Sequence, residues 1–205
     1  MIPAIEPKRL TGSEALVSPD GKKIGSLIDF WSWAYSDLAG NAERGALAEY
    51  IVACALGISH KERISWDKYD LLTDDGISVE VKTSGYLQTW EQKELSKPIF
   101  GIQQTYGWDS HSNKYDATQK RQADIYVFCL HKHTDLSTLD PLQISQWDFY
   151  LMPTQMINER FDKQKTVTLS ALLKEGAEKC EYKDLRDRIH YLLAYPTGDI
   201  EKESL

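Results

Sequence analysis

The sequence predicts a mixed α/β or α+β domain built around one central β-sheet. Three observations carry this prediction. Residues 41–57 have the pattern of a buried helix, residues 66–82 that of a β-hairpin, and residues 123–130 that of a strongly apolar strand. A further strand is expected at residues 147–153, so a single sheet can gather the strands while helices cover its faces.

The composition is that of an ordinary globular chain. Of the 205 residues, 41% are hydrophobic and 27% are charged, which is enough for one domain with a substantial core. We find no apolar run of the roughly 18 residues that span a bilayer and no secretory signal, so no membrane association is expected. The cysteines are odd in number and far apart, at Cys54, Cys129 and Cys180, which predicts reduced thiols in a cytoplasmic protein.

The formal net charge of the chain is −7. A strongly basic chain would indicate a nucleic-acid partner directly, and this sequence gives no such indication. The net charge does not exclude nucleic acid either, because a local basic cleft can bind phosphate while the rest of the surface is acidic.

The N-terminal region gives weak signals. Pro3, Pro7 and Pro19 predict loop over most of the first twenty residues. Residues 21–38, GKKIGSLIDFWSWAYSDL, are expected to open with a turn and to continue as a short helix or an aromatic-rich strand.

The segment NAERGALAEYIVACALG, residues 41–57, is the clearest helix. Asn41 can cap it and Gly57 can end it. It is apolar on nearly every side, so we expect it to be buried. Glu49 is the exception, and a lone carboxylate there is costly to desolvate unless it meets a partner or a metal.

Residues 66–82 are expected to form a hairpin around the turn at residues 74–76, Asp-Asp-Gly, with the glycine in a left-handed conformation. The hydrophobic pattern selects the register, because a slip of one residue would mix the two faces. In this register Asp70 lies opposite Glu80. The apolar pairs are Thr73–Ile77, Leu71–Val79 and Tyr69–Val81.

Beyond the hairpin, a polar and aromatic region at residues 83–122 has few regular signals. Strands bounded by charged residues or proline are expected at residues 123–130, 147–153 and 165–169. Ser170 is expected to cap a following helix, and residues 184–194, DLRDRIHYLLA, have the pattern of an amphipathic helix.

The polar face of the predicted hairpin has the composition of a metal site. Asp70 and Glu80 can supply hard oxygen ligands for Mg²⁺, and the backbone carbonyl of Val81 can add another. Carboxylates this close repel each other unless a cation lies between them. Lys82 can orient or help deprotonate a water, or stabilise charge on a phosphate. Glu49 can complete the outer shell of the metal or hold a metal-bound water.

A solvated strand face is the alternative interpretation of this stretch. The pattern Glu-x-Lys occurs four times, starting at Glu6, Glu80, Glu91 and Glu181, so the tripeptide alone has little specificity. Only the copy at residues 80–82 lies on an alternating strand, pairs with an acid across a turn, and follows a helix that carries an isolated acid. This context favours the metal site.

The arrangement resembles the PD-(D/E)XK nuclease superfamily, the restriction-endonuclease-like fold. The superfamily's helix acid maps to Glu49, its Asp to Asp70, and its (D/E)-x-K to Glu80 and Lys82; Tyr69 stands where the motif has proline. The resemblance implies Mg²⁺-dependent phosphodiester hydrolysis, usually of DNA, with Mn²⁺ able to substitute. It also implies a four-stranded mixed sheet flanked by helices.

We therefore expect residues 1–205 to form a single restriction-endonuclease-like domain. The nuclease core is expected at about residues 41–130, with the C-terminal strands and helix of about residues 145–195 packed on it. The expected activity is that of a restriction-like or repair-like DNA endonuclease, and RNA or branched DNA is an alternative substrate. A non-catalytic nucleic-acid-binding or regulatory protein that retains the fold is the other alternative. Such enzymes often act as homodimers, since cutting two strands needs two sites, but the sequence shows no dimer interface.

Candidate substrate-binding residues lie outside the acidic motif. Ser84 and Gln88 follow Lys82 closely and can line a groove for phosphates or base edges, although a polar loop is the alternative. Arg121 belongs to a basic stretch with interleaved aromatic residues, which suits a backbone-binding loop or an exposed loop over the core. The other members of that stretch are Lys114, Lys120, Tyr106, Trp108 and Tyr115. No structural zinc is expected, because Cys129, His131 and His133 lack a second ligand pair at a recognisable spacing.

Overall fold

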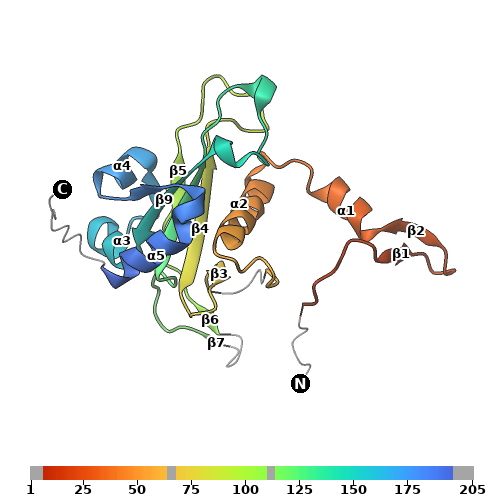
Figure 1. Cartoon of the computed structure of the whole chain (residues 1–205), viewed down its shortest axis with the longest axis horizontal. Coiled ribbons are helices and arrows are strands. Elements are labelled where there is room, and N and C mark those ends of the chain that lie inside the picture. Colours follow the sequence, from red (N-terminus) through yellow and green to blue (C-terminus); the bar gives the residue numbers. More distant parts are fainter. Residues whose placement is uncertain (1–6, 64–67, 110–113, 196–205) are drawn as a thin grey trace.

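The computed structural model describes residues 7–63, 68–109 and 114–195, and the start of the predicted hairpin at residues 66–67 lies outside these ranges. The chain folds into a layered α/β body and an N-terminal arm that extends away from it (Figure 1). No helix in the described ranges is long and apolar enough to cross a membrane.

A five-stranded mixed sheet forms the centre of the body. Its strand order is β11–β9–β8–β4–β3, and only the β4–β8 pair is parallel. The strands are β3 (Leu71–Leu72), β4 (Ser78–Gly85), β8 (Ile125–His131), β9 (Trp147–Pro153) and β11 (Glu178–Cys180). The predicted mixed sheet flanked by helices is thus confirmed, with five strands where the resemblance implied four.

Helices cover both faces of this sheet (Figure 1). On one face, α2 (Asn41–Ala55) and α5 (Leu185–Ala194) pack on apolar side chains of β4, β8 and β9. On the other face, α3 (Thr154–Phe161) and α4 (Leu169–Lys174) form a second apolar cluster with β8 and β9. A small sheet of β5 (Ile99–Gly101) and β10 (Thr166–Thr168) extends this second layer.

Strand β4 divides its side chains between the two layers. Val79 and Val81 belong to the cluster that contains α2. Because successive side chains of a strand point to opposite faces, Glu80 and Lys82 project from the other face. There the parallel register places Glu80 beside Tyr126 and Lys82 beside Phe128. Strand β4 therefore carries an apolar face toward α2 and a charged segment on its reverse.

The remaining elements are short. The N-terminal arm contains β1 (Ala15–Val17), β2 (Lys23–Ser26) and α1 (Leu27–Ala34), so the expected short helix follows a strand that was expected to be loop or turn. A two-stranded ribbon joins β6 (Trp108–Asp109) to β7 (Lys114–Tyr115). Single turns of 3₁₀-helix occur at Leu136–Thr138, Ile144–Gln146 and Tyr182–Asp184.

Several boundaries differ from the predictions for local reasons. Gly40, not Asn41, is the N-cap of α2, while Gly57 follows the helix with a φ of 75° as expected of a terminating glycine. The predicted burial of this helix holds for part of its surface, since Ala48, Ile51, Val52 and Ala53 are buried whereas Tyr50 is 56% exposed.

The C-terminal region also differs in two places. Thr168 caps α4 by accepting a hydrogen bond from the amide of Ala171, so Ser170 lies inside the helix rather than capping it. The predicted strand at residues 165–169 forms, but it pairs with β5 outside the central sheet. The strands at residues 123–130 and 147–153 and the helix at residues 184–194 are confirmed, within a residue or two at each end.

Candidate active site

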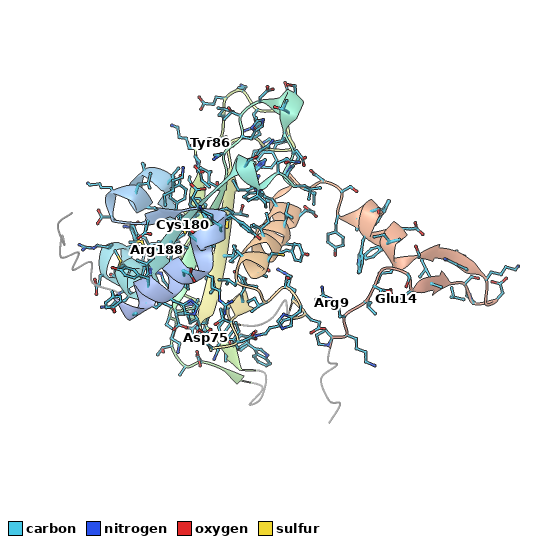
Figure 2. The ribbon with its side chains drawn as sticks, viewed as in Figure 1. Arg9, Glu14, Asp75, Tyr86, Cys180 and Arg188 are labelled. Carbon is cyan, nitrogen blue, oxygen red and sulfur yellow. The ribbon has the colours of Figure 1, made fainter. Side chains whose placement is uncertain are left out.

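The hairpin has the register that the turn predicts. Leu71 lies opposite Val79, and the Thr73 amide donates to the Ile77 carbonyl at 2.9 Å. Gly76 has a φ of 91°, a left-handed conformation that suits glycine. In Figure 2, Asp75 marks this turn, and Tyr86 lies beyond the opposite end of β4.

Asp70 lies just before the two-residue strand β3, where the ladder with β4 ends. Its Oδ2 accepts a hydrogen bond of 2.8 Å from the backbone amide of Val81. The amide and carbonyl of one strand residue point to the same edge, so the Val81 carbonyl also opens toward this carboxylate. Asp70 and the Val81 carbonyl therefore lie at one edge of β4.

Glu80 and Lys82 form an ion pair along the strand, with the Lys82 ammonium on Oε1 of Glu80. The pair is largely enclosed, since the side chains of Lys82 and Glu80 are only 30% and 18% exposed. Burial alone would lower the pKa of Lys82, but the carboxylates of Glu80 and Asp70 outweigh it and raise that pKa. The raised pKa favours the ammonium form of Lys82.

The pKa of Asp70 shows most clearly that negatively charged groups lie close together here. Burial raises the pKa of its carboxyl to about 7, and the nearby charges of Glu80 and Glu49 add to the effect. Lys82 and the Val81 amide oppose it without cancelling it. The charges of Glu80 and Glu49 thus disfavour the ionisation of Asp70, as expected where a further cation belongs.

Glu49 is not a solitary acid. Its two carboxylate oxygens accept hydrogen bonds of 2.5 and 2.9 Å from the Nε and Nη2 of Arg63, a bidentate pair. The Glu49 side chain is 12% exposed and that of Arg63 is 50% exposed. Sequence reasoning anticipated that Glu49 needs a partner but missed Arg63. The only signal was the charged run at residues 61–63, Lys-Glu-Arg, twelve residues after the acid.

The ligand set for a metal is small. Within the described ranges, no three His, Cys, Asp or Glu side chains converge closely enough to hold an ion between them. Two carboxylates and a carbonyl suit Mg²⁺, which commonly takes one or two protein carboxylates and fills its remaining positions with waters and substrate phosphate. Asp70, Glu80 and the Val81 carbonyl fit that description, with Glu49 outside the direct set because Arg63 holds it.

A cavity opens beside the acids. It has a volume of about 450 Å³, and Glu49, Arg63 and Asp70 contribute to its lining. Most of the remaining lining is apolar and comes from α2, from β3 and from the segment between them, including Tyr50 and Tyr69. This cavity gives a substrate group room next to two of the predicted site residues.

Comparison with known proteins decides the family. A family model described as bacteriophage T4 endonuclease IV matches residues 32–171, more than half of the chain. This chain belongs to the bacteriophage T4 endonuclease IV family. The matched segment contains all four predicted site residues and the strands β3, β4, β8 and β9. A search of curated proteins found no match.

Membership of the T4 endonuclease IV family supports endonuclease activity and a nucleic-acid substrate. The predicted nuclease is therefore supported at the level of the family. The structure adds that the four predicted residues interact electrostatically, because the pKa of Lys82 responds to Glu80, Asp70 and Glu49 together.

The other candidate residues of this T4 endonuclease IV family member have structural partners. Ser84 is buried, and its hydroxyl accepts a hydrogen bond of 3.3 Å from the Ile99 amide. Gln88 donates to the Gly85 carbonyl at 2.9 Å and accepts a bond from buried Arg44 at 3.3 Å. These contacts brace the loop after β4, and a role in substrate binding stays a prediction.

Arg121 is also committed to the interior. It is 5% exposed and donates to the Ile102 carbonyl and to Oδ1 of Asn158, both at 2.7 Å. Arg121 is thus a buried residue whose hydrogen bonds link two segments of the chain, and it is not part of an exposed basic loop. The rings of Trp108 and Tyr115 pack with their centroids 4.8 Å apart, and the Lys114 side chain lies outside the described part of the chain.

Tyr126 is a neighbour of the acids that the sequence did not reveal. Burial raises the pKa of its phenol, and the charges of Glu80 and Asp70 add to this while Arg121 opposes it. The residue lies on β8 beside Glu80 in the parallel register. A parallel pairing between distant strands leaves no local mark in the sequence, so no pattern could have identified it.

Proposed function

We propose that the chain is a Mg²⁺-dependent DNA endonuclease of the PD-(D/E)XK type, of the restriction or repair kind. The observation that supports it most is the crowding of Asp70, Glu80 and Glu49 around Lys82, with the pKa of Asp70 raised to about 7. Buried carboxylates that repel each other are costly, and a divalent cation would relieve that cost.

In this proposal Asp70, Glu80 and the Val81 carbonyl hold the ion, and Mn²⁺ is expected to substitute. The bound ion supplies Lewis-acid polarisation of the phosphate and lowers the pKa of bound water. The Val81 amide fixes the orientation of the Asp70 carboxylate through its 2.8 Å hydrogen bond. Arg63 holds Glu49 at the rim of the cavity, where Glu49 can accept a hydrogen bond from a water.

Lys82 has an electrostatic role in the proposal. Its raised pKa keeps the side chain protonated at neutral pH, so Nζ can donate hydrogen bonds to a phosphate oxygen on which negative charge develops. In the free protein the same ammonium rests on Glu80. Substrate binding would therefore divide its hydrogen bonds between the carboxylate and the phosphate.

The test compares cleavage of plasmid DNA in Mg²⁺ by the wild type, Lys82→Ala and a control, Lys132→Ala. Lys132 also pairs with an acid on the sheet, Asp148, but that acid lies outside the cluster. Lys82→Ala should reduce cleavage by about 100-fold or more, while the control should be unchanged. Cleavage by Lys82→Ala at the wild-type rate would remove the catalytic assignment, and single-stranded DNA and RNA substrates run in parallel define the substrate class.

A further inference from the structure

The turn of the hairpin contacts a helix from the far end of the chain. Nε2 of His190, on α5, lies 2.6 Å from Oδ2 of Asp75, although 115 residues separate the two in sequence. In Figure 2, Asp75 marks the turn and Arg188 marks α5. The ladder that this turn closes is short, since β3 is two residues long. Contacts made by the turn therefore contribute to the position of the hairpin.

The imidazole ring of His190 lies between two hydrogen-bond acceptors. Its Nδ1 is 2.7 Å from the carbonyl oxygen of Arg186, one helical turn earlier, and carbonyl oxygens can only accept. Asp75 is an ionised carboxylate at neutral pH, because hydrogen bonds from Thr73 and His190 lower its pKa to about 2, so it too can only accept. Both ring nitrogens must carry a proton for both contacts to be hydrogen bonds. The geometry therefore requires His190 to be an imidazolium cation.

Loss of one proton from His190 removes part of this arrangement. A neutral imidazole has one donor nitrogen and one acceptor nitrogen, so one of the two contacts places a lone pair against an oxygen. The attraction between imidazolium and carboxylate is lost at the same time. The Arg186 carbonyl and Asp75 raise the pKa of His190 above its ordinary 6.5. The stabilising contribution of His190 is thus fully present below pH 6.5 and is lost as the pH rises through that raised pKa.

A small cavity lies between the turn and α5. Its volume is about 100 Å³, and residues of the turn, of α5 and of the chain at the end of α2 line it: Leu56, Ile58, Thr73, Asp74, Asp75, Arg186 and His190. At this point the turn and α5 meet through His190 and Asp75, across a gap that apolar side chains do not fill. The polar contact therefore fastens the two elements here.

The other charged groups around the contact are Asp74 and Arg186, which line the same cavity, and Lys61 and His60, which act on Asp74. Lys61 pairs with Asp74 at 2.6 Å and donates to the Leu72 carbonyl at 3.0 Å. A lysine thus holds the turn on one side and a histidine holds it on the other. Histidine is the side chain whose charge ordinarily changes between pH 5 and 8, so the two contacts should differ in their response to pH.

We propose that His190 and Asp75 form a pH-sensitive switch, in which the protonated histidine fastens α5 to the hairpin turn and the neutral histidine releases it. Leu185 and Ile189 of α5 belong to the apolar core on the α2 face of the sheet. Release therefore frees the turn while the helix keeps its apolar contacts. This switch is independent of the proposed catalytic role.

The first measurement is an NMR titration of the histidine rings in the full chain, with His190→Gln used to assign the resonance. In the wild type, His190 should titrate above pH 6.5 and carry both ring protons below it. Asp75→Asn should lower the midpoint by about 0.5 pH unit or more. The control Asp74→Asn removes the same charge from the neighbouring residue and should lower it less, because Asp74 pairs with Lys61.

The second measurement is a double-mutant cycle for His190→Ala and Asp75→Asn, from urea unfolding in EDTA at pH 6 and pH 8.5. The coupling between the two side chains should fall by about two-fold or more from the lower to the higher pH. The matched cycle of Lys61→Ala and Asp74→Asn should give the same coupling at both pH values. Because the coupling is a difference between variants, the titration of other groups cancels.

Each other outcome overturns the proposal. A wild-type His190 that titrates at or below pH 6.5 shows that the ring is not held as the cation, and this result requires no variant. A His190–Asp75 coupling that is equal at both pH values shows a contact that does not switch, and no coupling at either pH shows that the contact fastens nothing. A control cycle with the same pH dependence would assign the effect to another group near the turn.

Discussion

Replacing Asp70 by asparagine should stabilise the metal-free protein at alkaline pH. The amide oxygen can still accept the hydrogen bond from the Val81 amide, while the charge that crowds Glu80 and Glu49 is removed. The pKa of Asp70 is raised from 3.8 to about 7 by burial and by those acids. The carboxyl therefore favours the folded state below pH 3.8, and this contribution is lost as the pH rises through about 7.

The magnitude follows from the size of the shift. Each pH unit of difference between the folded and unfolded pKa corresponds to about 1.4 kcal/mol, so ionising Asp70 in the folded state costs about 4 kcal/mol in total. The stability difference between Asp70→Asn and the wild type should widen by about 2–3 kcal/mol from pH 5 to pH 8. The amide of Asn is a weaker hydrogen-bond acceptor than a carboxylate, which lowers the stability of the variant by the same amount at both pH values. This constant loss does not affect the predicted change between pH 5 and pH 8.

The assay is urea unfolding in EDTA at both pH values. Asp135→Asn is the control, because hydrogen bonds from Ser137 lower the pKa of Asp135, so its removal should not stabilise the protein at pH 8. A stability difference for Asp70→Asn that is the same at pH 5 and pH 8, or that narrows as the pH rises, would refute the electrostatic reasoning. Added Mg²⁺ should narrow the difference by stabilising the wild type alone.

Two further predictions concern buried charge. Arg63→Ala leaves the Glu49 carboxylate without its bidentate partner, and we expect a loss of about 1–3 kcal/mol in urea unfolding at pH 7, with a smaller loss for Arg63→Lys; no change would show that water replaces the arginine fully. Burial and the neighbouring Arg44 lower the pKa of His131 to about 4, so its contribution to stability is present above pH 6.5 and lost as the pH falls through about 4. After allowance for solvent screening this loss is about 2 kcal/mol. In His131→Phe the free energy of unfolding should therefore fall less steeply between pH 6.5 and pH 4 than in the wild type. An equally steep fall would contradict the role of His131.

The hairpin shows what a sequence can determine about a site. The Asp-Asp-Gly turn and the alternation at residues 77–82 determine the register, because each constrains the backbone locally. That register places Asp70 beside Val81 and puts Glu80 and Lys82 on one face, as the structure shows. The segment matched by the endonuclease family model spans these residues.

The partners of those residues depend on tertiary contacts and could not be predicted. Arg63 reaches Glu49 from a connecting segment, and Tyr126 reaches Glu80 through a parallel pairing across more than forty residues. Arg121 has the positive charge of a phosphate-binding residue, but it is buried and donates a hydrogen bond to Asn158 instead. Charge and spacing in the sequence suggest candidate site residues, whereas tertiary packing decides which of those residues are exposed to solvent.

The exposed arm could not be predicted from the sequence. Residues 21–38 are expected to form a turn followed by a short helix or an aromatic-rich strand, and nothing in that pattern shows where the segment packs. In this chain the segment instead projects from the body with Trp33 exposed.

The central claim is that the carboxylates of the hairpin hold a catalytic Mg²⁺. The most direct test is the rate of plasmid cleavage as a function of Mg²⁺ concentration for the wild type, Glu80→Gln and Glu159→Gln, an exposed acid on α3. The wild type and Glu159→Gln should cleave in Mg²⁺ and not in EDTA, and Glu80→Gln should be slower by about 100-fold or more at every concentration. Cleavage that persists in EDTA, or that Glu80→Gln performs at the wild-type rate, would contradict the account.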